Sequence, residues 1–316
     1  MRFQLRHGGT RFDVVGFGEI SVDDVLLVDE VPPWGGKARV LRRERLGGGQ
    51  GATAMVALAR LGCTTAILGV VGDEPVGREA LAELDAEGVD VSGVDLHPTP
   101  GATHQSVIVV DRRGERTVLW SEEETAELEP GELPEARIAA GKIFHTDGNH
   151  LEAAANAAFI ARKNGCVVSC DLDRFEPPYT GELLSRVDLC IVSAGFMAAF
   201  AAAHDHAAIA AALPGLAACL PAHSVACVTL GDRGALAWDR GRLITAPAFP
   251  PWERIVDTTA CGDTFRAGFL CALLDGRDLA ACLRFANAAA ALKTSALGRR
   301  GCPTRARVET FLRGPR

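Results

Sequence analysis

The stretch DTTACGDTFRAGF, residues 257–269, places a run of small residues directly before a predicted helix. Ala260, Cys261 and Gly262 carry little side-chain bulk, so an anion can approach their backbone amides closely. The first N–H groups of a helix have no partner inside the helix and carry the positive end of its dipole. Asp263 adds a carboxylate at the same end, where it would repel an anion but could accept a proton from an attacking hydroxyl. The stretch suits phosphoryl transfer to an alcohol, and a plain capping role for Asp263 is the alternative.

Outward from this stretch, strands and helices alternate along most of the chain. Short apolar runs predict buried strands, and Ala- and Leu-rich segments with helical spacing predict helices. We expect strands at 12–17, 66–71, 143–146, 167–170, 189–192 and 225–229, and helices at 52–61, 77–87, 152–164, 262–274 and 279–294, with an Ala-rich stretch at 196–212. This alternation predicts an α/β fold: a doubly wound, mostly parallel sheet sandwiched by helices.

Two regions do not follow the alternation. Residues 22–44 alternate only loosely, and residues 103–120 read as a hairpin around the turn Asp-Arg-Arg-Gly at 111–114. We expect both regions to pair as a small β-sheet lid, formed from about 22–45 and 100–122. A single domain would then cover 11–316, with residues 1–10 as a flexible leader.

Composition excludes several classes of protein. The chain has 316 residues and a formal net charge of -7, without a basic stripe, so a nucleic-acid partner is not expected. No apolar run reaches the ~18 residues that a membrane span needs. The ten cysteines form no CxxC pair, which favours reduced thiols in a cytoplasmic protein.

Residues 257–269 resemble the second signature of the PfkB/ribokinase family of carbohydrate kinases, which is close to D-T-x-[GA]-A-G-D-[ST]-F. LGGGQGATAMVALARLG (46–62) resembles the first signature, and GEISVDDV (18–25) the opening strand with a sugar-binding Asp. VTLGDRGAL (228–236) is similar to the nucleotide-side strand and turn, and ANAAAALKTSALG (286–298) to the helix and loop beside the adenine. The resemblance spans about 13–312 and implies a ribokinase-like fold that uses ATP and Mg²⁺.

The resemblance also implies roles for individual residues. Asp263 would be the catalytic base, and the amides of Ala260, Cys261 and Gly262 the anion hole. The sugar would be bound by Asp23, Gly48, Gly49, Gln50, Thr53 and Asp147, and the nucleotide by Thr229, Gly231, Gly234 and Asn287. Relatives often bind K⁺ near the anion hole, and here Asp257 and Thr259, with the loop 298–301, could form such a site.

Three positions depart from the family pattern. Thr53 stands where the family usually has Asn, which leaves the identity of the sugar open, and Cys261 replaces the usual Ala. The family's Asn-x-x-Glu motif, which helps to hold Mg²⁺ through water, is replaced by Ser-Ala-Gly-Phe at 193–196. Mg²⁺ would then be held mainly by phosphates and water. Asp171 and Asp173 are further candidates for sugar or metal-water contacts.

The leading hypothesis is an ATP-dependent kinase of a small ribose- or ketohexose-like carbohydrate. One alternative is a nucleoside kinase of the same fold, in which Trp34 and Trp120 of the lid would form the slot for the base. The other is a sugar-binding regulator without catalysis, suggested by the missing Asn-x-x-Glu motif. Helix capping is an equally good interpretation of Asp147. The exposed edges expected for the lid sheet predict a homodimer.

Overall fold

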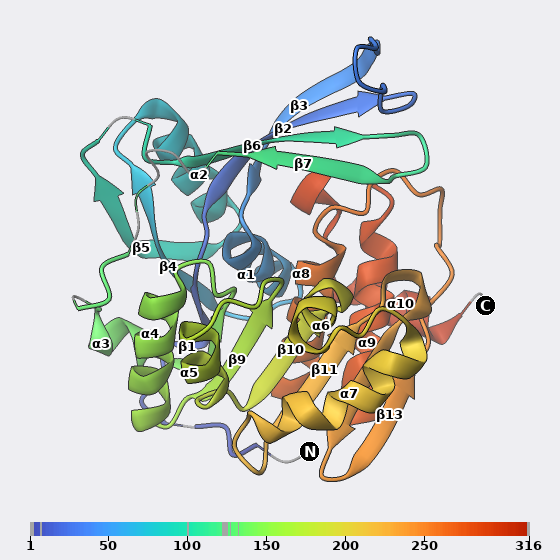
Figure 1. Cartoon of the computed structure of the whole chain (residues 1–316). Coiled ribbons are helices and arrows are strands. Elements are labelled where there is room, and N and C mark those ends of the chain that lie inside the picture. The colour runs from blue at the N-terminus through green and yellow to red at the C-terminus, as the bar shows by residue number, and fades with distance from the viewer. Residues whose placement is uncertain are drawn as a thin grey trace.

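A mostly parallel sheet forms the centre of the molecule (Figure 1). The computed structural model describes residues 3–6, 8–99, 101–121, 126, 128–131 and 133–314. Within these residues the sheet has nine strands, in the order β13 (Arg242–Ala246), β12 (Ala235–Asp239), β11 (Val225–Thr229), β10 (Leu189–Ser193), β9 (Val167–Leu172), β8 (Gly141–Thr146), β1 (Phe12–Phe17), β4 (Thr65–Gly72) and β5 (Val89–His97). The strands from β11 to β5 pair in parallel, while β12 and β13 add an antiparallel hairpin at one edge.

Helices cover both faces of this sheet, which is why its central strands are continuous apolar runs. All residues of β4 and β9 are buried. One face packs against α1 (Gln50–Arg60), α2 (Pro75–Ala86), α8 (Cys261–Leu274), α9 (Leu279–Lys293) and α10 (Arg305–Arg313). The other packs against α3 (Glu135–Ile138), α4 (Leu151–Lys163), α5 (Tyr179–Leu184), α6 (Ala194–Ala201) and α7 (His206–Ala218). Two short 3₁₀ helices, η1 (Gly231–Arg233) and η2 (Gly298–Gly301), interrupt loops.

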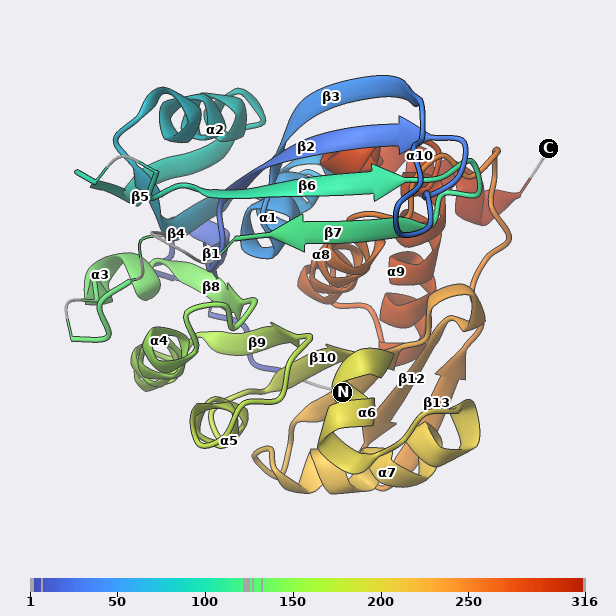
Figure 2. The same cartoon turned by 45° about the horizontal axis from the view of Figure 1, so that its top comes forward.

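A second sheet lies over one end of the first (Figures 1 and 2). Its strand order is β3 (Val40–Gly48), β2 (Ser21–Val28), β6 (His104–Val110) and β7 (Arg116–Trp120). Because β1 ends at Phe17 and β2 begins at Ser21, this lid sheet is attached at the carboxyl end of the parallel strands. Its inner residues Val25 and Ile108 pack against Leu297, which follows α9. The lid therefore stands where ligands bind in open α/β sheets.

The expected fold class is confirmed, with several local differences. The edge strand β5 was not predicted, because its sequence VDVSGVDLH is largely polar and its outer half is exposed. The stretch 196–212 is not continuous: Ala202 adopts a left-handed conformation with φ 51°, and Asp205 starts α7 by accepting a hydrogen bond from the Ala208 amide at 2.8 Å. The last helix, α10, was also not predicted.

The first residues of the chain, expected to form a leader, make defined contacts. Phe3 and Leu5 pack against the apolar cluster under α1, α8 and α9. The Arg6 guanidinium donates to the Ala139 carbonyl at 3.0 Å. Within the described residues no single helix is long and apolar enough to cross a membrane; α6 and α7 pass that test only as a pair, bent by 71°.

Candidate active site

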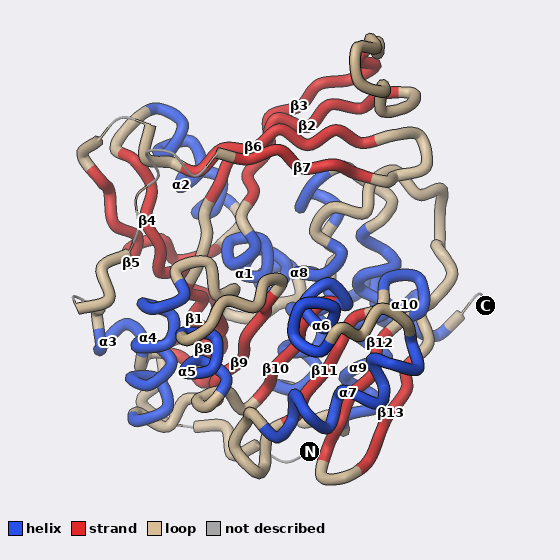
Figure 3. Tube along the Cα trace, viewed as in Figure 1, coloured by secondary structure: helices blue, strands red, loops and turns tan. Residues whose placement is uncertain are grey.

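The N-terminus of α8 lies beneath the lid, next to α1 (Figure 3). Ala260 opens the helix in a left-handed conformation with φ 63°, and no side chain caps it. Within the described part of the chain, the backbone N–H groups of Ala260, Gly262 and Asp263 have no hydrogen-bond partner. The Cys261 amide donates to the Thr258 carbonyl at 3.3 Å. This helix end therefore presents unpaired donors at the positive end of the dipole, a setting that attracts an anion.

Asp263 stands in the first turn of α8, among other carboxylates. Removal from water raises its pKa to about 7, and the charges of Asp173 and Asp147 add to the rise. The guanidinium groups of Arg266 and Arg116 oppose it. A carboxyl group with a pKa near neutrality can both accept and release a proton at physiological pH, as a general base must.

A buried ion pair supports this turn of the helix from below. The Arg266 guanidinium contacts the Asp171 carboxylate at the end of β9, and both side chains are almost fully buried. Arg266 also donates through Nε to the Ile191 carbonyl of β10 at 3.3 Å. Burial lowers the pKa of Arg266, but the charges of the surrounding carboxylates together raise it above its usual value, so it stays charged. Because the guanidinium passes directly beneath Gly262, a side chain at that position would collide with it.

On the lid side, Asp23 lies in the middle of strand β2, so it is not a turn residue. Its carboxylate accepts hydrogen bonds from the hydroxyls of Ser106 at 2.7 Å and Ser21 at 3.2 Å. Burial raises the pKa of Asp23. A Cβ at Gly48 would overlap this carboxylate, so glycine is required at position 48 by the approach of Asp23 rather than by turn geometry.

The Asp147 carboxylate is occupied by backbone amides. It accepts hydrogen bonds from Glu19 at 2.8 Å, Gly51 at 2.8 Å and Asn149 at 3.0 Å. Asp147 therefore ties the loop after β1 to the start of α1. The first residue before α4 is His150, which makes no side-chain cap, so Asp147 does not cap that helix. A direct contact of Asp147 with sugar stays a prediction.

The other expected sugar residues gather at the start of α1. Gly49 precedes the helix with φ 85°, and the Gln50 amide bridges the Asp173 carboxylate and the side chain of Asn149. Thr53 is buried on the next turn of the same helix. Polar groups of three separate segments thus meet between the lid and the sheet.

The expected nucleotide residues lie near the hairpin edge of the sheet. Thr229 ends β11, and its hydroxyl donates to the Val192 carbonyl at 3.4 Å. Gly231 begins η1 and Gly234 follows it, with positive φ values of 62° and 88°, which favour glycine. The Asn287 amide of α9 donates to the carbonyls of Ala246 and Pro247, both at 3.1 Å. Its amide thereby fixes the end of β13.

The segment 193–196, which stands in place of the Asn-x-x-Glu motif, packs into the core through Phe196. Ser193 caps α6 by accepting from the Phe196 amide at 3.1 Å. The Phe196 ring is fully buried and packs against Phe175 and Phe200, with ring centroids 5.9 and 5.8 Å away. In the described ranges, no group of three or more His, Cys, Asp or Glu side chains is placed to hold a metal ion. Position 196 therefore offers no carboxylate to Mg²⁺.

Two charged residues of this region were not singled out from the sequence. Arg266 and Lys293 each interrupt an apolar helix run, and Lys293 is fully buried with its ammonium group against Asp257. A charge on the apolar side of a helix is the signal that could have identified them, because such a charge needs a partner.

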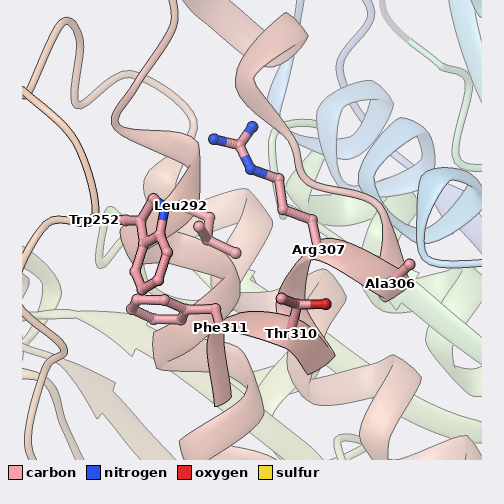
Figure 4. Close-up of a pocket in the computed structure, with 6 residues that line it drawn as sticks. All are labelled: Trp252, Leu292, Ala306, Arg307, Thr310 and Phe311. Carbon is pink, nitrogen blue, oxygen red and sulfur yellow. The ribbon is translucent and has the colours of Figure 1, made fainter. Parts of the chain in front are cut away.

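A separate pocket of about 310 Å³ lies beside α10 (Figure 4). It is lined by Trp252, Leu292, Ala306, Arg307, Thr310 and Phe311. None of these residues belongs to the expected site, and no carboxylate lines the pocket. The pocket therefore does not coincide with the expected site.

A doubly wound α/β sheet with a small β-sheet lid at the carboxyl ends of its parallel strands defines the ribokinase-like class of proteins. The chain resembles the structure of an Arabidopsis thaliana ribokinase complexed with ribose and ATP, with a TM-score of 0.80 and 22% identity over 96% of this chain and 99% of the other. It is 30% identical to an ATP-dependent ribose-1-phosphate kinase of Halopiger xanaduensis, over 95% of this chain and 97% of the relative. It is 28% identical to a ribokinase of Bacillus subtilis, over 93% and 97% of the two chains.

The family model described as pfkB family carbohydrate kinase matches residues 11–305, so the chain belongs to the pfkB family of carbohydrate kinases. The predicted family, fold and enzyme class, an ATP-dependent carbohydrate kinase, are confirmed.

Proposed function

We propose that this enzyme transfers the γ-phosphoryl group of ATP to a hydroxyl of a small ribose- or ketohexose-like carbohydrate. The supporting observation is the N-terminus of α8, where unpaired amides stand beside a carboxyl group whose pKa is raised to about 7. The amides of Ala260 and Gly262 donate hydrogen bonds that stabilise the negative charge on the transferring phosphoryl group. The amide of Asp263 is also unpaired and extends this anion hole by one residue. The Cys261 amide takes part once its long bond to Thr258 opens.

In the reaction, the sugar hydroxyl oxygen forms a bond to the γ-phosphorus as the bond to the β-phosphate oxygen breaks and ADP leaves. The hydroxyl proton passes to the Asp263 carboxylate. Unpaired amides at the helix N-terminus stabilise the negative charge without reorganising during the reaction. Mg²⁺ would neutralise nucleotide phosphates, and it would be coordinated by those phosphates and water because Phe196 fills the place of the missing glutamate.

The sugar is held from the lid and from α1. Asp23 carries acceptor oxygens suited to vicinal hydroxyls, while Gln50 and Thr53 offer further polar groups. Glycines at positions 48 and 49 allow the backbone to approach the sugar. Thr229, Gly231, Gly234 and Asn287 receive the nucleotide at the hairpin edge of the central sheet.

Two observations favour a sugar over a nucleoside and over a role without catalysis. Trp34 is completely exposed at the tip of the lid and Trp120 is 56% exposed, so neither forms an apolar slot for a base. A binding protein without catalysis would have no use for a carboxyl group of raised pKa beside unpaired amides.

The experiment is an ADP-release assay with ATP, Mg²⁺ and a panel of pentoses, ketohexoses, sugar phosphates and nucleosides, with ATP alone as the control. We expect ADP release only with a sugar or sugar phosphate. Preferred turnover of adenosine would establish the nucleoside alternative. Tight sugar binding in calorimetry, with no transfer at any Mg²⁺ concentration, would establish the regulator.

The lid also supports a proposal on assembly. We propose that the segments at about 22–45 and 100–122 act as one lid on a domain of residues 11–316 and join two copies into a homodimer. All residues of the edge strand β7 are exposed, among them Val118 and Leu119, and exposed apolar side chains on an edge strand favour association. Light scattering should give twice the chain mass, and Leu119→Lys should give a monomer. A monomeric wild type at micromolar concentration contradicts the proposal.

All ten cysteines are free thiols, as expected in a reducing compartment. We therefore propose that the enzyme works in the cytoplasm. Recovery of the native protein from a membrane or extracellular fraction would contradict this placement.

A further inference from the structure

A lysine ammonium group lies where the sequence suggested a potassium site. Lys293, the last residue of α9, is fully buried, and its Nζ donates to the carbonyl oxygens of Asp257 at 2.9 Å and Ala296 at 3.1 Å. Nζ also lies 3.6 Å from the Asp257 carboxylate. The ammonium is thus surrounded by carbonyl and carboxylate oxygens, the donor set that a monovalent cation takes from a protein.

The candidate potassium ligands are already engaged. One Asp257 carboxylate oxygen accepts from the Thr259 amide and the other from the Gly298 amide, both at 2.7 Å. Gly301 approaches so closely that a side chain there would crowd the Lys293 carbonyl and the lysine stem. A K⁺ ion does not fit these residues as they stand, because the ammonium takes the position that the ion would need.

The position of this charge matters for the anion hole. Asp257 begins the loop 257–262, and its carboxylate holds that loop through the Thr259 amide. The Lys293 charge lowers the pKa of the Cys261 thiol, against the larger effect of burial, so its field reaches the turn where the unpaired amides lie. A buried charge without partners would be costly, so the ammonium group depends on the oxygen atoms of this loop. Its hydrogen bonds in turn fix the loop in place.

We propose that the ammonium group of Lys293 is a tethered substitute for a monovalent cation: it positions the anion-hole loop and makes phosphoryl transfer independent of K⁺. Lys293 acts through the loop and is a positioning residue. The inference rests on the proposed function for its effect on turnover, whereas its effect on cation binding does not depend on any substrate.

The test compares the wild type, Lys293→Ala and Lys293→Met in buffers with K⁺, NH₄⁺ or the large cation N-methylglucamine at equal ionic strength. Lys293→Ala leaves room for an ion, whereas Lys293→Met fills the same space without a charge. For the wild type we expect kcat to change less than about twofold between cations. Lys293→Ala should lose at least about tenfold in N-methylglucamine and recover with K⁺ or NH₄⁺, and Lys293→Met should stay low in every buffer.

Thermal unfolding of the same proteins provides a readout without substrate. An ion that binds only the folded state raises the melting temperature, so K⁺ should raise it for Lys293→Ala by a few degrees and leave the wild type and Lys293→Met unchanged. A wild type activated more than about fivefold by K⁺, or a Lys293→Ala variant whose turnover and melting temperature both ignore K⁺, overturns the proposal. If no sugar supports ADP release, the proposed function fails while the melting experiment still decides the role of Lys293.

Discussion

Replacement of Arg266 by Met tests the buried charges that support the reaction centre. Arg266 and Asp171 are 3% and 2% exposed, and their contact joins α8 to the end of β9. Met keeps most of the side-chain volume and removes the charge. Loss of one partner from a buried ion pair costs about 3–5 kcal/mol, because the other charge stays buried without compensation. The unfolding free energy of Arg266→Met should fall by that amount, with a drop in melting temperature on the order of 10 °C.

The stability loss of Arg266→Met should also depend on pH, and its direction follows from the pKa of Asp171. Burial raises the pKa of Asp171, and Arg266 opposes the rise. Without Arg266 the folded-state pKa of Asp171 rises further above its unfolded value. The contribution of Asp171 to stability is then present in acid and is lost as the pH increases through that raised pKa. The stability deficit of Arg266→Met should therefore shrink as the pH is lowered below neutrality.

Urea unfolding between pH 5 and 8 measures both quantities. The double variant Arg266→Met/Asp171→Leu removes both charges and should regain most of the lost stability. Arg313→Met is the matched control, because Arg313 forms an exposed pair with Glu309, and its loss should change stability by less than about 1 kcal/mol. A loss under 1 kcal/mol for Arg266→Met, or a double variant less stable than the single one, would refute the reasoning.

Three further predictions concern residues around α1 and α8. The kcat/KM should fall by up to about tenfold for each unit that the pH drops below about 7, because the Asp263 carboxyl must be ionised to accept a proton and its pKa is about 7; a flat profile from pH 5.5 to 8 contradicts this role. Cys261→Ala should retain turnover within about threefold, since burial raises the thiol pKa to about 11 and leaves it unreactive; loss of transfer on this substitution contradicts an inert thiol. Gly49→Ala should lower the free energy of unfolding by at least about 2 kcal/mol, because φ is 85° and a Cβ would strike the Glu19 carbonyl. The control is Gly215→Ala, where nothing lies within 4 Å of the added Cβ. Equal losses for the two variants would contradict backbone strain at position 49.

Much of the fold follows from local sequence patterns. The strands of the central sheet are apolar runs such as TAILGVVG, and buried parallel strands have this pattern because helices cover both faces. The edge strand β5 escapes the same reasoning, since its polar outer half is exposed and its pairing with β4 is a tertiary feature. The lid was predicted by exclusion, from segments that break the alternation, and its strand order could not be read from the sequence.

For the site too, features set by local sequence could be predicted, whereas features set by contacts between distant segments could not. Small residues before Asp263 predict an open helix terminus, and among the residues that the structure describes none accepts a hydrogen bond from the amides of 260, 262 and 263. Partners distant in sequence were not predictable: Asp147 is bound by amides of two other segments, and Arg266 meets Asp171 across the sheet. Lys293 lies 36 residues from Asp257 in the sequence, so the hydrogen bond from its ammonium group to the Asp257 carbonyl becomes visible only in the fold.

The most direct test of the mechanism is the rate of phosphoryl transfer by Asp263→Asn in a single turnover, measured beside calorimetric binding of the sugar identified by the substrate panel. Asn keeps the shape of the side chain and cannot accept the hydroxyl proton as a carboxylate does. Asp205→Asn, at the start of α7 on the far side of the sheet, is the matched control. We predict that Asp263→Asn slows transfer by about 10²–10⁴-fold while its sugar affinity stays within about threefold of the wild type. Transfer within tenfold of the wild type would contradict the role of Asp263 as the base.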